Sequence, residues 1–385
     1  MPFSLIDLFA GTGAFSKGFE NSTNAEYRTV FCNDLLPIAT QTAQANHPDA
    51  RCVAGDIRKL RRSQVAEAIG IKRGDLDVII GGPPCQGFSS IRPFRSSLED
   101  DPRNSLFEEF ASFVNYFRPR AFVIENVVGL ATHRDGIIIE AMQTCFDALG
   151  YDSDWRILNA ANYGIPQRRE RLIFIGLPRG TAVTFPPPTH KSNGSTIGLK
   201  DRCRMMRPAD DSLFSRAPVL DESITVDEAI GDLPSIGSGE ESLSYDKPPQ
   251  NAYQAARRKA LEKLTLHGST GHTAKMLEII KHSGPNINSI PPHLISSGFS
   301  SCYSRLAPDS PAVTITVNFV HPASNRCIHP HLDRALTPRE GARLQSFDDD
   351  FIFKGNRSQI VKQIGNAVPP LLGKVIGEHV ASLIA

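Results

Sequence analysis

The chain has 385 residues and a formal net charge of +1; 40% of its residues are hydrophobic and 22% are charged. These values are ordinary for a globular protein and exclude wholesale disorder and a fibrous class. The length predicts two domains, one of which can be split in sequence. The small net charge leaves the partner open, because a nucleic-acid enzyme can bind its substrate through a local basic cleft.

The seven cysteines show no repeated short spacing, which argues against a zinc site and against a disulfide framework. We therefore expect no bound metal and a reducing, cytoplasmic environment. The N-terminus has no basic stretch leading into a long apolar run, and no later window approaches the roughly 18 apolar residues of a membrane span. Export and membrane insertion are not expected.

The first half of the chain alternates short apolar runs with amphipathic stretches, which predicts strands joined by crossover helices. In chain order we expect a strand at Ser4–Phe9, a helix at Phe15–Glu20, a strand at Tyr27–Asn33, a helix at Ile38–Asn46, a strand at Leu76–Ile80, a helix at Ser105–Phe117, a strand at Ala121–Glu125, a helix at Ile137–Leu149 and a strand at Leu172–Leu177. This order predicts a doubly wound, mainly parallel α/β sheet whose ligands gather at the strand ends.

The character of the sequence changes near Phe185, where PPPTHKSNGST is rich in Pro, Ser and Gly. We predict a catalytic and cofactor-binding domain over residues 1–185 and a smaller, irregular domain over residues 186–324. Order returns at TPREGARLQSF, which predicts a capped helix, and the chain ends in a helical pattern at Pro370–Ile384. Residues 325–385 are too few for a separate domain, so we expect them to complete the first one.

The opening segment DLFAGTGAFSKGF places Gly11 and Gly13 between a strand and a helix, where backbone amides can approach a nucleotide-like ligand. A purely steric reason for the glycines is equally compatible with this pattern. The next strand ends at Asn33-Asp34, where a carboxylate can bind ribose hydroxyls, and this favours an adenosyl cofactor. Further on, Asp56 can accept from an adenine amino group and Ile57 can pack on the ring, although Asp56 can also simply cap the next helix.

The most specific segment is GGPPCQGFS, residues 81–89, which follows an apolar strand. Two prolines fix the backbone before Cys85, and glycines on both sides leave room for a substrate. As a thiolate, Cys85 can add to an electron-poor ring carbon. The alternative is a buried structural cysteine, but the flanking Pro-Pro and Gly would be unusual around a core residue.

Polar residues also lie at two further strand ends. Glu125 can hold a proton for a heteroaromatic nitrogen, or it can be a helix cap or a solvated side chain. The segment QRRER supplies Gln167, Arg169 and Arg171, and alternating arginines on one strand face can orient a carboxylate, a base or a phosphate. A surface charge face is the alternative.

In content, order and spacing, these segments resemble the cytosine-5 DNA methyltransferase family, of the bacterial modification type. The matching segments are DLFAGTG, GGPPCQGFS, ENV, QRRER, LTPRE and QIGNAVPP, which span residues 7–370. The resemblance implies a Rossmann-like methyltransferase fold, a target-recognition domain at 186–324, and a hinge and C-terminal segment at 325–385. The residues implied to surround the cofactor, S-adenosylmethionine, are Phe9, Gly11, Gly13, Asp34, Asp56, Ile57, Pro84, Leu106, Asn366 and Val368.

The resemblance also implies the catalytic roles. Cys85 is the nucleophile that adds to carbon 6 of cytosine, Glu125 is the partner of ring nitrogen 3, and Arg169 and Arg171 are orienting groups. Addition of the thiolate makes carbon 5 able to attack a methyl group. Because these carbons are inaccessible in a stacked duplex, the base should be flipped out. We expect Gln167 and Ser89 to contact the substrate, and the Ser89–Asp101 loop to close over it.

The expected partner is double-stranded DNA, with a cognate restriction endonuclease acting separately. The resemblance favours a monomer in the bacterial cytoplasm, associated with the nucleoid. Base recognition is assigned to the uncovered segment, whose basic clusters can meet phosphates or guanine edges or can form a solvated surface. These clusters are Lys191, Lys200, Arg202, Arg204 and Arg207, followed by Arg257, Arg258 and Lys259.

Three other functions compete with this interpretation. A branch of the same family that methylates transfer RNA shares the catalytic apparatus, but the long variable segment favours DNA. A non-catalytic DNA-binding relative is disfavoured because Cys85, Glu125 and Arg171 are all present. A nicotinamide-dependent oxidoreductase is disfavoured because the full GxGxxG spacing is missing and QIGNAVPP is present.

Overall fold

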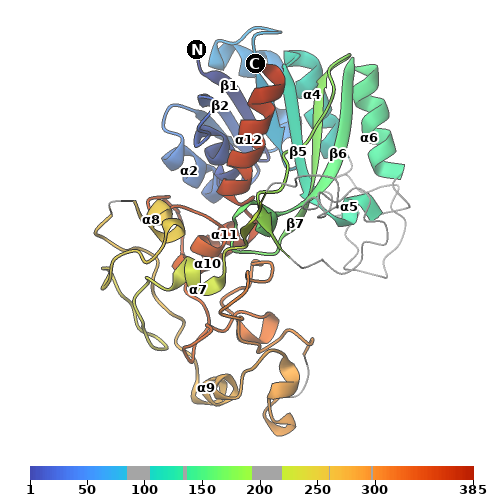
Figure 1. Ribbon diagram of the computed structural model, residues 1–385. Helices are drawn as coiled ribbons and strands as arrows, with labels where there is room; N and C mark the ends of the chain where they lie inside the picture. The colour runs from blue at the N-terminus through green and yellow to red at the C-terminus, as the bar shows by residue number, and fades with distance from the viewer. Residues whose placement is uncertain (85–104, 133–136, 193–218, 260, 296–297) are drawn as a thin grey trace.

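The structure, a computed structural model, describes residues 1–84, 105–132, 137–192, 219–259, 261–295 and 298–385. A seven-stranded sheet forms its centre, in the order β3-β2-β1-β4-β5-β7-β6 (Figure 1). Every strand pairing is parallel except those of β7, which runs against both β5 and β6. The strands are β1 (Phe3–Leu8), β2 (Tyr27–Asp34), β3 (Arg51–Ala54), β4 (Val78–Gly81), β5 (Ala121–Val127), β6 (Tyr151–Asn159) and β7 (Glu170–Pro178).

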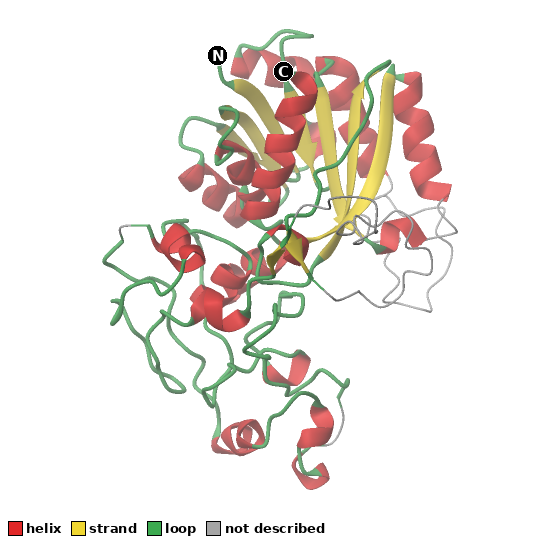
Figure 2. Cartoon of the chain, in the orientation of Figure 1, coloured by secondary structure: helices red, strands yellow, loops and turns green. Residues whose placement is uncertain are grey.

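Helices cover both faces of this sheet (Figure 2). One face packs its apolar side chains against α1 and α12, and the other packs against α3, α4 and α6. The doubly wound α/β class predicted from the sequence is therefore confirmed. The helices of this half are α1 (Ala14–Glu20), α2 (Pro37–Asn46), α3 (Arg62–Ile69), α4 (Ser105–Phe117), α5 (Gly129–Thr132), α6 (Ile137–Ala148) and α12 (Pro370–Ile384).

The last helix, α12, packs directly on the first helix, α1, although they lie at opposite ends of the chain (Figure 1). Glycines allow this close approach: a Cβ added to Gly18 would lie 2.2 Å from the Pro370 carbonyl oxygen, and one added to Gly373 would lie 2.7 Å from the Phe15 carbonyl oxygen. The Tyr27 hydroxyl donates to the Gly377 carbonyl at 2.8 Å. The C-terminal segment thus forms part of the same core as the sheet.

The remaining described residues form a second, loop-rich region that extends away from the sheet beyond α10 and α11 (Figure 1). Its apolar side chains join those of α10 and α11 in one buried cluster. A two-stranded parallel pair, β8 (His190–Lys191) with β9 (Asp221–Glu222), lies at its start. The helices of this region and its junction are α7 (Val226–Ile230), α8 (Ala252–Arg258), α9 (Ala274–Lys281), α10 (Pro338–Leu344) and α11 (Arg357–Asn366).

In the seven-stranded sheet, the structure adds β3 and β6 to the five strands that the sequence predicted. β3 has only four residues, and β6 lies at the edge of the sheet with half of its residues polar, so neither produces a long apolar run. The capped helix predicted at TPREGARLQSF is α10, whose N-cap Thr337 forms a capping box with Glu340. Within the described residues, no helix is long and apolar enough to cross a membrane.

Candidate functional site

The predicted site residues follow strands that end at one edge of the sheet. The parallel strands β1, β2, β4 and β5 all finish there, and the antiparallel strand β7 begins there, since Arg171 pairs with Val127. Loops at the carboxyl ends of parallel strands form the usual ligand crevice of a doubly wound fold. The chain therefore collects the DLFAGTG, GGPP, ENV and QRRER segments at one place.

The glycine turn after β1 has an unusual backbone. Phe9, Gly11 and Gly13 all have positive φ, at 57°, 54° and 73°, a region that residues with a Cβ rarely adopt. A Cβ on Gly13 would lie 2.7 Å from Nε2 of His47, whereas a Cβ on Gly11 would meet nothing within 4 Å. Gly13 thus has the steric reason considered above, while Gly11 faces open space.

Asp34 ties the end of β2 to this turn. Its carboxylate accepts from the Gly11 amide at 2.9 Å and from the Leu36 amide at 2.8 Å. Burial raises the pKa of Asp34 above its ordinary value, although these two hydrogen bonds oppose the rise. The next residue, Leu35, is 66% exposed, and this large apolar surface beside the turn is a feature that the sequence argument missed.

Asp56 and Ile57 lie beyond β3. Asp56 caps the short 3-10 helix Ile57–Lys59 by accepting from the Arg58 amide at 3.0 Å, and it also forms an ion pair with the Arg58 guanidinium. The capping role considered for Asp56 is therefore present. Ile57 is buried in the core cluster that also contains Leu8, so its side chain packs in the core next to the end of β1.

The segment that leads to Cys85 packs against the end of β5. The Asn126 side chain donates to the Pro83 carbonyl at 2.9 Å, and a Cβ on Gly82 would lie 3.4 Å from Oε2 of Glu125. Glu125 thus lies beside a residue that precedes Cys85 by three positions. Cys85, Ser89 and the loop to Asp101 lie outside the described residues.

Glu125 is held by an arginine from β7. Nε of Arg171 lies 2.8 Å from Oε1 of Glu125, and both side chains are largely buried. Burial lowers the pKa of Arg171, an effect that the charge and hydrogen bond of Glu125 oppose. The pair fixes one carboxylate oxygen at the strand edge.

Arg169 does not share this position. Its buried guanidinium donates to the carbonyls of Ile315, Gly365 and Ala367 at 3.2, 3.4 and 3.0 Å. Burial and the nearby charge of Arg171 hold the pKa of Arg169 well below its usual value. Arg169 lies one residue before β7, which begins at Glu170, and the two arginines bind different groups. Glu125 is nevertheless close enough for its charge to oppose the fall in the pKa of Arg169.

Gln167 is also interior. Its amide nitrogen donates to the Leu344 carbonyl and to Oε1 of Gln345, and its amide oxygen accepts from the Ile315 amide. The side chain is fully buried and bonded within the protein, and the substrate contact of Gln167 stays a prediction.

The other predicted cofactor residues are spread around the same edge. Pro84 follows Pro83, and Leu106 is half-buried at the start of α4. Asn366 is the last residue of α11 and is exposed, whereas Val368 is half-buried against the core of the sheet. The two carbonyls that flank Asn366 are those bound by Arg169, so Arg169 supports this part of the edge.

A buried polar network lies beneath the glycine turn, and the sequence argument did not find it. The Ser16 hydroxyl donates to Asp7 at 2.7 Å, and the His47 ring bonds to the Gly13 carbonyl and to Glu20, both at 2.9 Å. Burial, opposed by the Ser16 hydrogen bond, raises the pKa of Asp7 to about 7. Although burial alone would raise it, the hydrogen bond and charge of His47 lower the pKa of Glu20 to about 2.

Three buried arginines organise the junction around α10. Arg334 pairs with Glu340, Arg343 pairs with Asp232 and Asp349, and Arg339 also reaches Asp349. Burial opposes the charge of Arg343, but hydrogen bonds and attraction from Asp349 and Asp232 outweigh it and raise the pKa of Arg343. Buried ions of this kind are tolerated only when paired, so the network fixes how α10 meets α7 and the loop after α10.

The basic clusters proposed for DNA are only partly described. Arg257 pairs with Asp348, Lys259 reaches Asp348 and Asp350, and Arg258 donates to the Lys247 carbonyl. These three side chains therefore bond within the protein. Lys191 is exposed, and the other four cationic residues, Lys200, Arg202, Arg204 and Arg207, lie outside the described residues.

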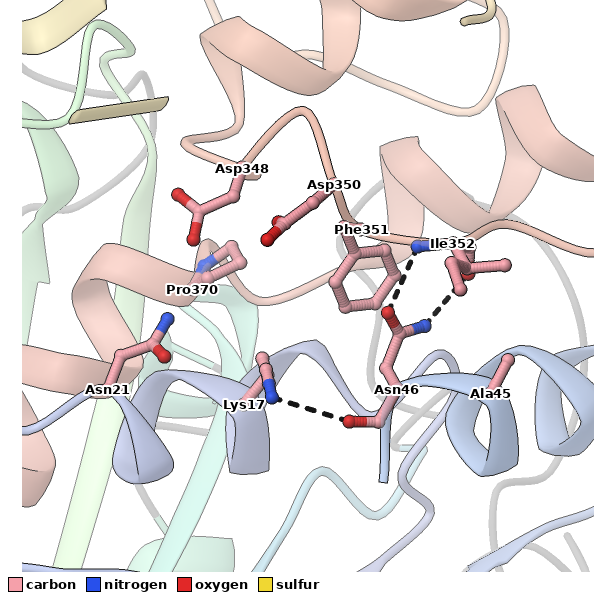
Figure 3. Close-up of a pocket in the computed structure, with 9 residues that line it drawn as sticks. All are labelled: Lys17, Asn21, Ala45, Asn46, Asp348, Asp350, Phe351, Ile352 and Pro370. Carbon is pink, nitrogen blue, oxygen red and sulfur yellow. Dashed lines mark hydrogen bonds between the residues drawn. The ribbon is translucent and has the colours of Figure 1, made fainter. Parts of the chain in front are cut away.

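A pocket of about 200 Å³, lined by both polar and apolar side chains, lies between α1, α2 and the loop after α10 (Figure 3). Asn46 spans it by donating to the Ile352 carbonyl at 2.8 Å and accepting from the Ile352 amide at 3.0 Å, while Lys17 donates to the Asn46 carbonyl at 3.3 Å. None of the predicted cofactor or catalytic residues that the structure describes lines this pocket. The hydrogen bonds of Asn46 across this pocket join α2 to the loop after α10.

The chain is similar to several known proteins over nearly its whole length. The sequence model of C-5 cytosine-specific DNA methylase matches residues 3–382. The Type II methyltransferase M.AgeI of Thalassovita gelatinovora is 32% identical, with 99% of each chain covered. The Type II methyltransferase M1.HphI of Haemophilus parahaemolyticus is 35% identical, with 100% of this chain and 88% of that protein covered. A solved structure of a DNA modification methyltransferase encoded within an E. coli prophage has a TM-score of 0.74 at 25% identity, with 99% of each chain covered.

Proposed function

The chain belongs to the C-5 cytosine-specific DNA methylase family, and from this premise we propose that it methylates carbon 5 of a flipped cytosine in a specific sequence of double-stranded DNA. The observation that carries the proposal is the position of Glu125, which is held by Arg171 at 2.8 Å and lies beside Gly82. A nucleophile and an acid that act on one ring must lie within a few ångströms of each other. The sequence distance from Gly82 to Cys85 is compatible with that requirement.

The chemistry explains why both groups are needed. Carbon 5 of cytosine is too weak a nucleophile to attack a methyl group unaided. The Cys85 thiolate adds to carbon 6, and Glu125 supplies a hydrogen bond or proton at nitrogen 3, so that the electron pair moves toward carbon 5. After methylation, a base removes the proton on carbon 5, the bond from sulfur to carbon 6 breaks, and the ring recovers its aromatic form.

Arg171 and Arg169 have separate roles in this proposal. Arg171 orients the Glu125 carboxylate through a charge-assisted hydrogen bond. Arg169 is a positioning residue, because it binds the backbone carbonyls on both sides of Asn366 and does not meet Glu125.

The turn after β1 fits an adenosyl cofactor. Gly11 borders open space, Leu35 offers an exposed apolar surface for a ring, and each Asp34 oxygen accepts one amide, which leaves lone pairs for ribose hydroxyls. Ile57, which is buried in the core, supports the proposed cofactor site. The other residues that complete this site are Phe9, Gly13, Asp56, Pro84, Leu106, Asn366 and Val368. When bound, S-adenosylmethionine supplies the methyl group on its sulfonium sulfur.

The substrate and the biological role follow from the family premise. A duplex hides both reactive carbons, so the target base must leave the stack, at a cost of a few kcal/mol. We propose that residues 186–324 recognise the flanking bases and that residues 325–385 complete the catalytic half. The Type II names of the relatives support a role in a restriction-modification system, with a separate endonuclease of the same specificity.

One assay tests the substrate and the position of the methyl group. The protein is incubated with labelled S-adenosylmethionine and plasmid DNA, and modified cytosines are mapped by bisulfite sequencing. We expect label in DNA and protection of cytosines within one short sequence. Label on a ring nitrogen or on the exocyclic amine, or transfer to transfer RNA alone, would contradict the proposal.

A second assay tests the nucleophile. Cys85→Ser should abolish turnover, while Cys145→Ser, a matched change in α6, should leave it intact. DNA with 5-fluorocytosine at the target should trap the wild-type protein as a covalent adduct when the methyl donor is present. A near-normal rate for Cys85→Ser, or no adduct with active protein, would remove Cys85 from the mechanism.

A further inference from the structure

Arg168 and Arg326 are two arginines that the catalytic proposal does not use. Arg168 lies within QRRER, next to Arg169, and Arg326 follows the 3-10 helix Pro322–Ser324. Hydrogen bonds fix the backbone at both positions. The Arg168 amide donates to the Ala312 carbonyl at 2.8 Å, and the Arg326 amide donates to Oδ1 of Asn325 at 2.8 Å. Both side chains are only half-exposed.

Among the residues that the structure describes, neither guanidinium has a carboxylate partner. Nε of each arginine is buried and makes no hydrogen bond. Buried Nε atoms without a hydrogen bond also occur in Arg62, Arg169 and Arg257. Arg62 and Arg257 form ion pairs with Glu109 and Asp348, and the Arg169 guanidinium donates to three backbone carbonyls. Within the described parts of the chain, the side chain of Arg326 donates only to the Pro285 carbonyl.

The two charges lie near enough to affect each other. Burial, and after it the positive charge of Arg168, lowers the pKa of Arg326. Two neighbouring guanidiniums without an anion repel each other. With Nε of each arginine buried and one terminal nitrogen of Arg326 bonded to the Pro285 carbonyl, the remaining terminal N–H groups are the donors available to a ligand. A tetrahedral anion with several oxygens would neutralise both charges and accept from both donor sets.

The segment around Thr314 joins the two arginines to the site. The Thr314 hydroxyl donates to the Arg168 carbonyl at 2.9 Å, and two residues later the Thr316 hydroxyl accepts from the Asn325 side chain at 3.2 Å. Arg168 itself precedes β7, whose first residues pair with the end of β5 beside Glu125. The arginine pair therefore belongs to the edge of the sheet where the target base is expected.

We propose that Arg168 and Arg326 together bind one backbone phosphate of the DNA next to the flipped cytosine. This inference rests on the proposed function, because it takes DNA as the substrate. Rotation of a nucleotide out of the stack turns it about its own backbone, so a phosphate held at this edge fixes the axis of that rotation. The contact carries no sequence information.

The test compares Arg168→Gln, Arg326→Gln and the double variant with Arg179→Gln. Arg179 is an exposed arginine that pairs with Asp147 just after the end of β7, at the opposite edge of the sheet, and it controls for loss of one charge. Affinity is measured against salt concentration for two duplexes, one with the mapped target sequence and one without it. Thermal unfolding and affinity for S-adenosylmethionine report whether each variant is folded.

We expect each single variant to weaken both duplexes by about tenfold, the value of one charge-assisted contact. Because both arginines hold one phosphate, the double variant should lose less than the product of the two single losses. In the Gln variants, the slope of log Kd against log salt concentration should fall by about one. Arg168→Lys and Arg326→Lys should keep most of the wild-type slope. Arg179→Gln should change neither quantity.

Two results would overturn the inference. One is an unchanged affinity and salt slope in Arg326→Gln or Arg168→Gln while the wild-type protein methylates DNA; the other is a loss confined to the target duplex, which would indicate a base contact. If a Gln variant does not fold, its Lys counterpart and the other arginine decide the matter. Absence of methylation by the wild-type protein would instead contradict the proposed function itself.

Discussion

The two glycines of the turn after β1 should respond differently to the same substitution. Both have positive φ, 54° for Gly11 and 73° for Gly13, so an alanine at either position costs roughly 1–2 kcal/mol in backbone strain. At Gly13 the new Cβ would also lie 2.7 Å from Nε2 and 2.8 Å from Cδ2 of His47. The His47 ring would have to move.

That movement has a calculable cost. His47 bonds to the Gly13 carbonyl and to Glu20, each at 2.9 Å. A neutral bond contributes about 1 kcal/mol and a bond to a charged group about 1.5–3 kcal/mol. Gly13→Ala should therefore lower the free energy of unfolding by about 3.5–6 kcal/mol, against about 1–2 kcal/mol for Gly11→Ala.

Urea unfolding measures both losses, and calorimetric titration with S-adenosylmethionine separates stability from binding. Gly11→Ala should weaken cofactor binding while the protein remains folded, because its methyl group enters open space beside the proposed site. Gly13→Ala should act mainly on stability. Equal destabilisation by the two variants would refute the role given to His47, and unchanged cofactor affinity in Gly11→Ala would refute the open side of the turn as the cofactor site.

Four further outcomes follow from the site and its supports. Glu125→Gln should reduce kcat by about 10²–10⁴-fold with little change in cofactor affinity, as expected for loss of an acid-base group; a small effect on kcat in single-turnover assays would contradict its role. Arg169→Lys should raise the KM for S-adenosylmethionine, because it loses carbonyls that flank Asn366, whereas Arg171→Lys should mainly lower kcat; steady-state kinetics that show the reverse pattern would contradict this division. Because burial raises the pKa of Asp7 from 3.8 to about 7, the wild-type protein loses stability as pH rises across that range, and Asp7→Asn should be more stable by up to about 4 kcal/mol above pH 7, with the advantage absent below pH 4 in urea titrations. Arg343→Met leaves the buried carboxylates of Asp232 and Asp349 without this partner and should destabilise the protein by about 3–5 kcal/mol in denaturant; a neutral result would mean that Arg339 compensates fully.

The sequence predicted the parts of the fold that local patterns determine. The apolar runs of β1, β2, β4, β5 and β7 and the capping box at Thr337 are each contained in a few consecutive residues, so they could be found without tertiary information. β6 has polar residues at its exposed edge, and its pairing with β7 stabilises it in place of apolar burial. Such a strand produces no clear periodic signal.

Side-chain partners far apart in sequence could not be found in this way. The bonds from Arg169 reach residues 146 to 198 positions away, and Gln167 bonds to residues 177 and 178 positions away. Spacing alone predicted that Arg169 and Arg171 share one strand face, and it carries no information about such distant partners. A usable signal did exist for the buried network, because Asp7 interrupts the apolar run FSLIDLF, and an ionisable residue within a buried strand requires a partner.

The reversed direction of β7 explains how QRRER serves two parts of the site. The carboxyl edge of a parallel sheet receives the ends of its strands, so another parallel strand would bring its start to the opposite edge. Since β7 is antiparallel to β5, its first residues lie where β4 and β5 finish. Arg171 can then hold Glu125, and Arg169, two positions earlier, can hold the carbonyls beside Asn366. Reversal of one strand thus joins the proposed catalytic carboxylate to the C-terminal segment through neighbouring residues, although Glu125 and Asn366 belong to opposite halves of the chain.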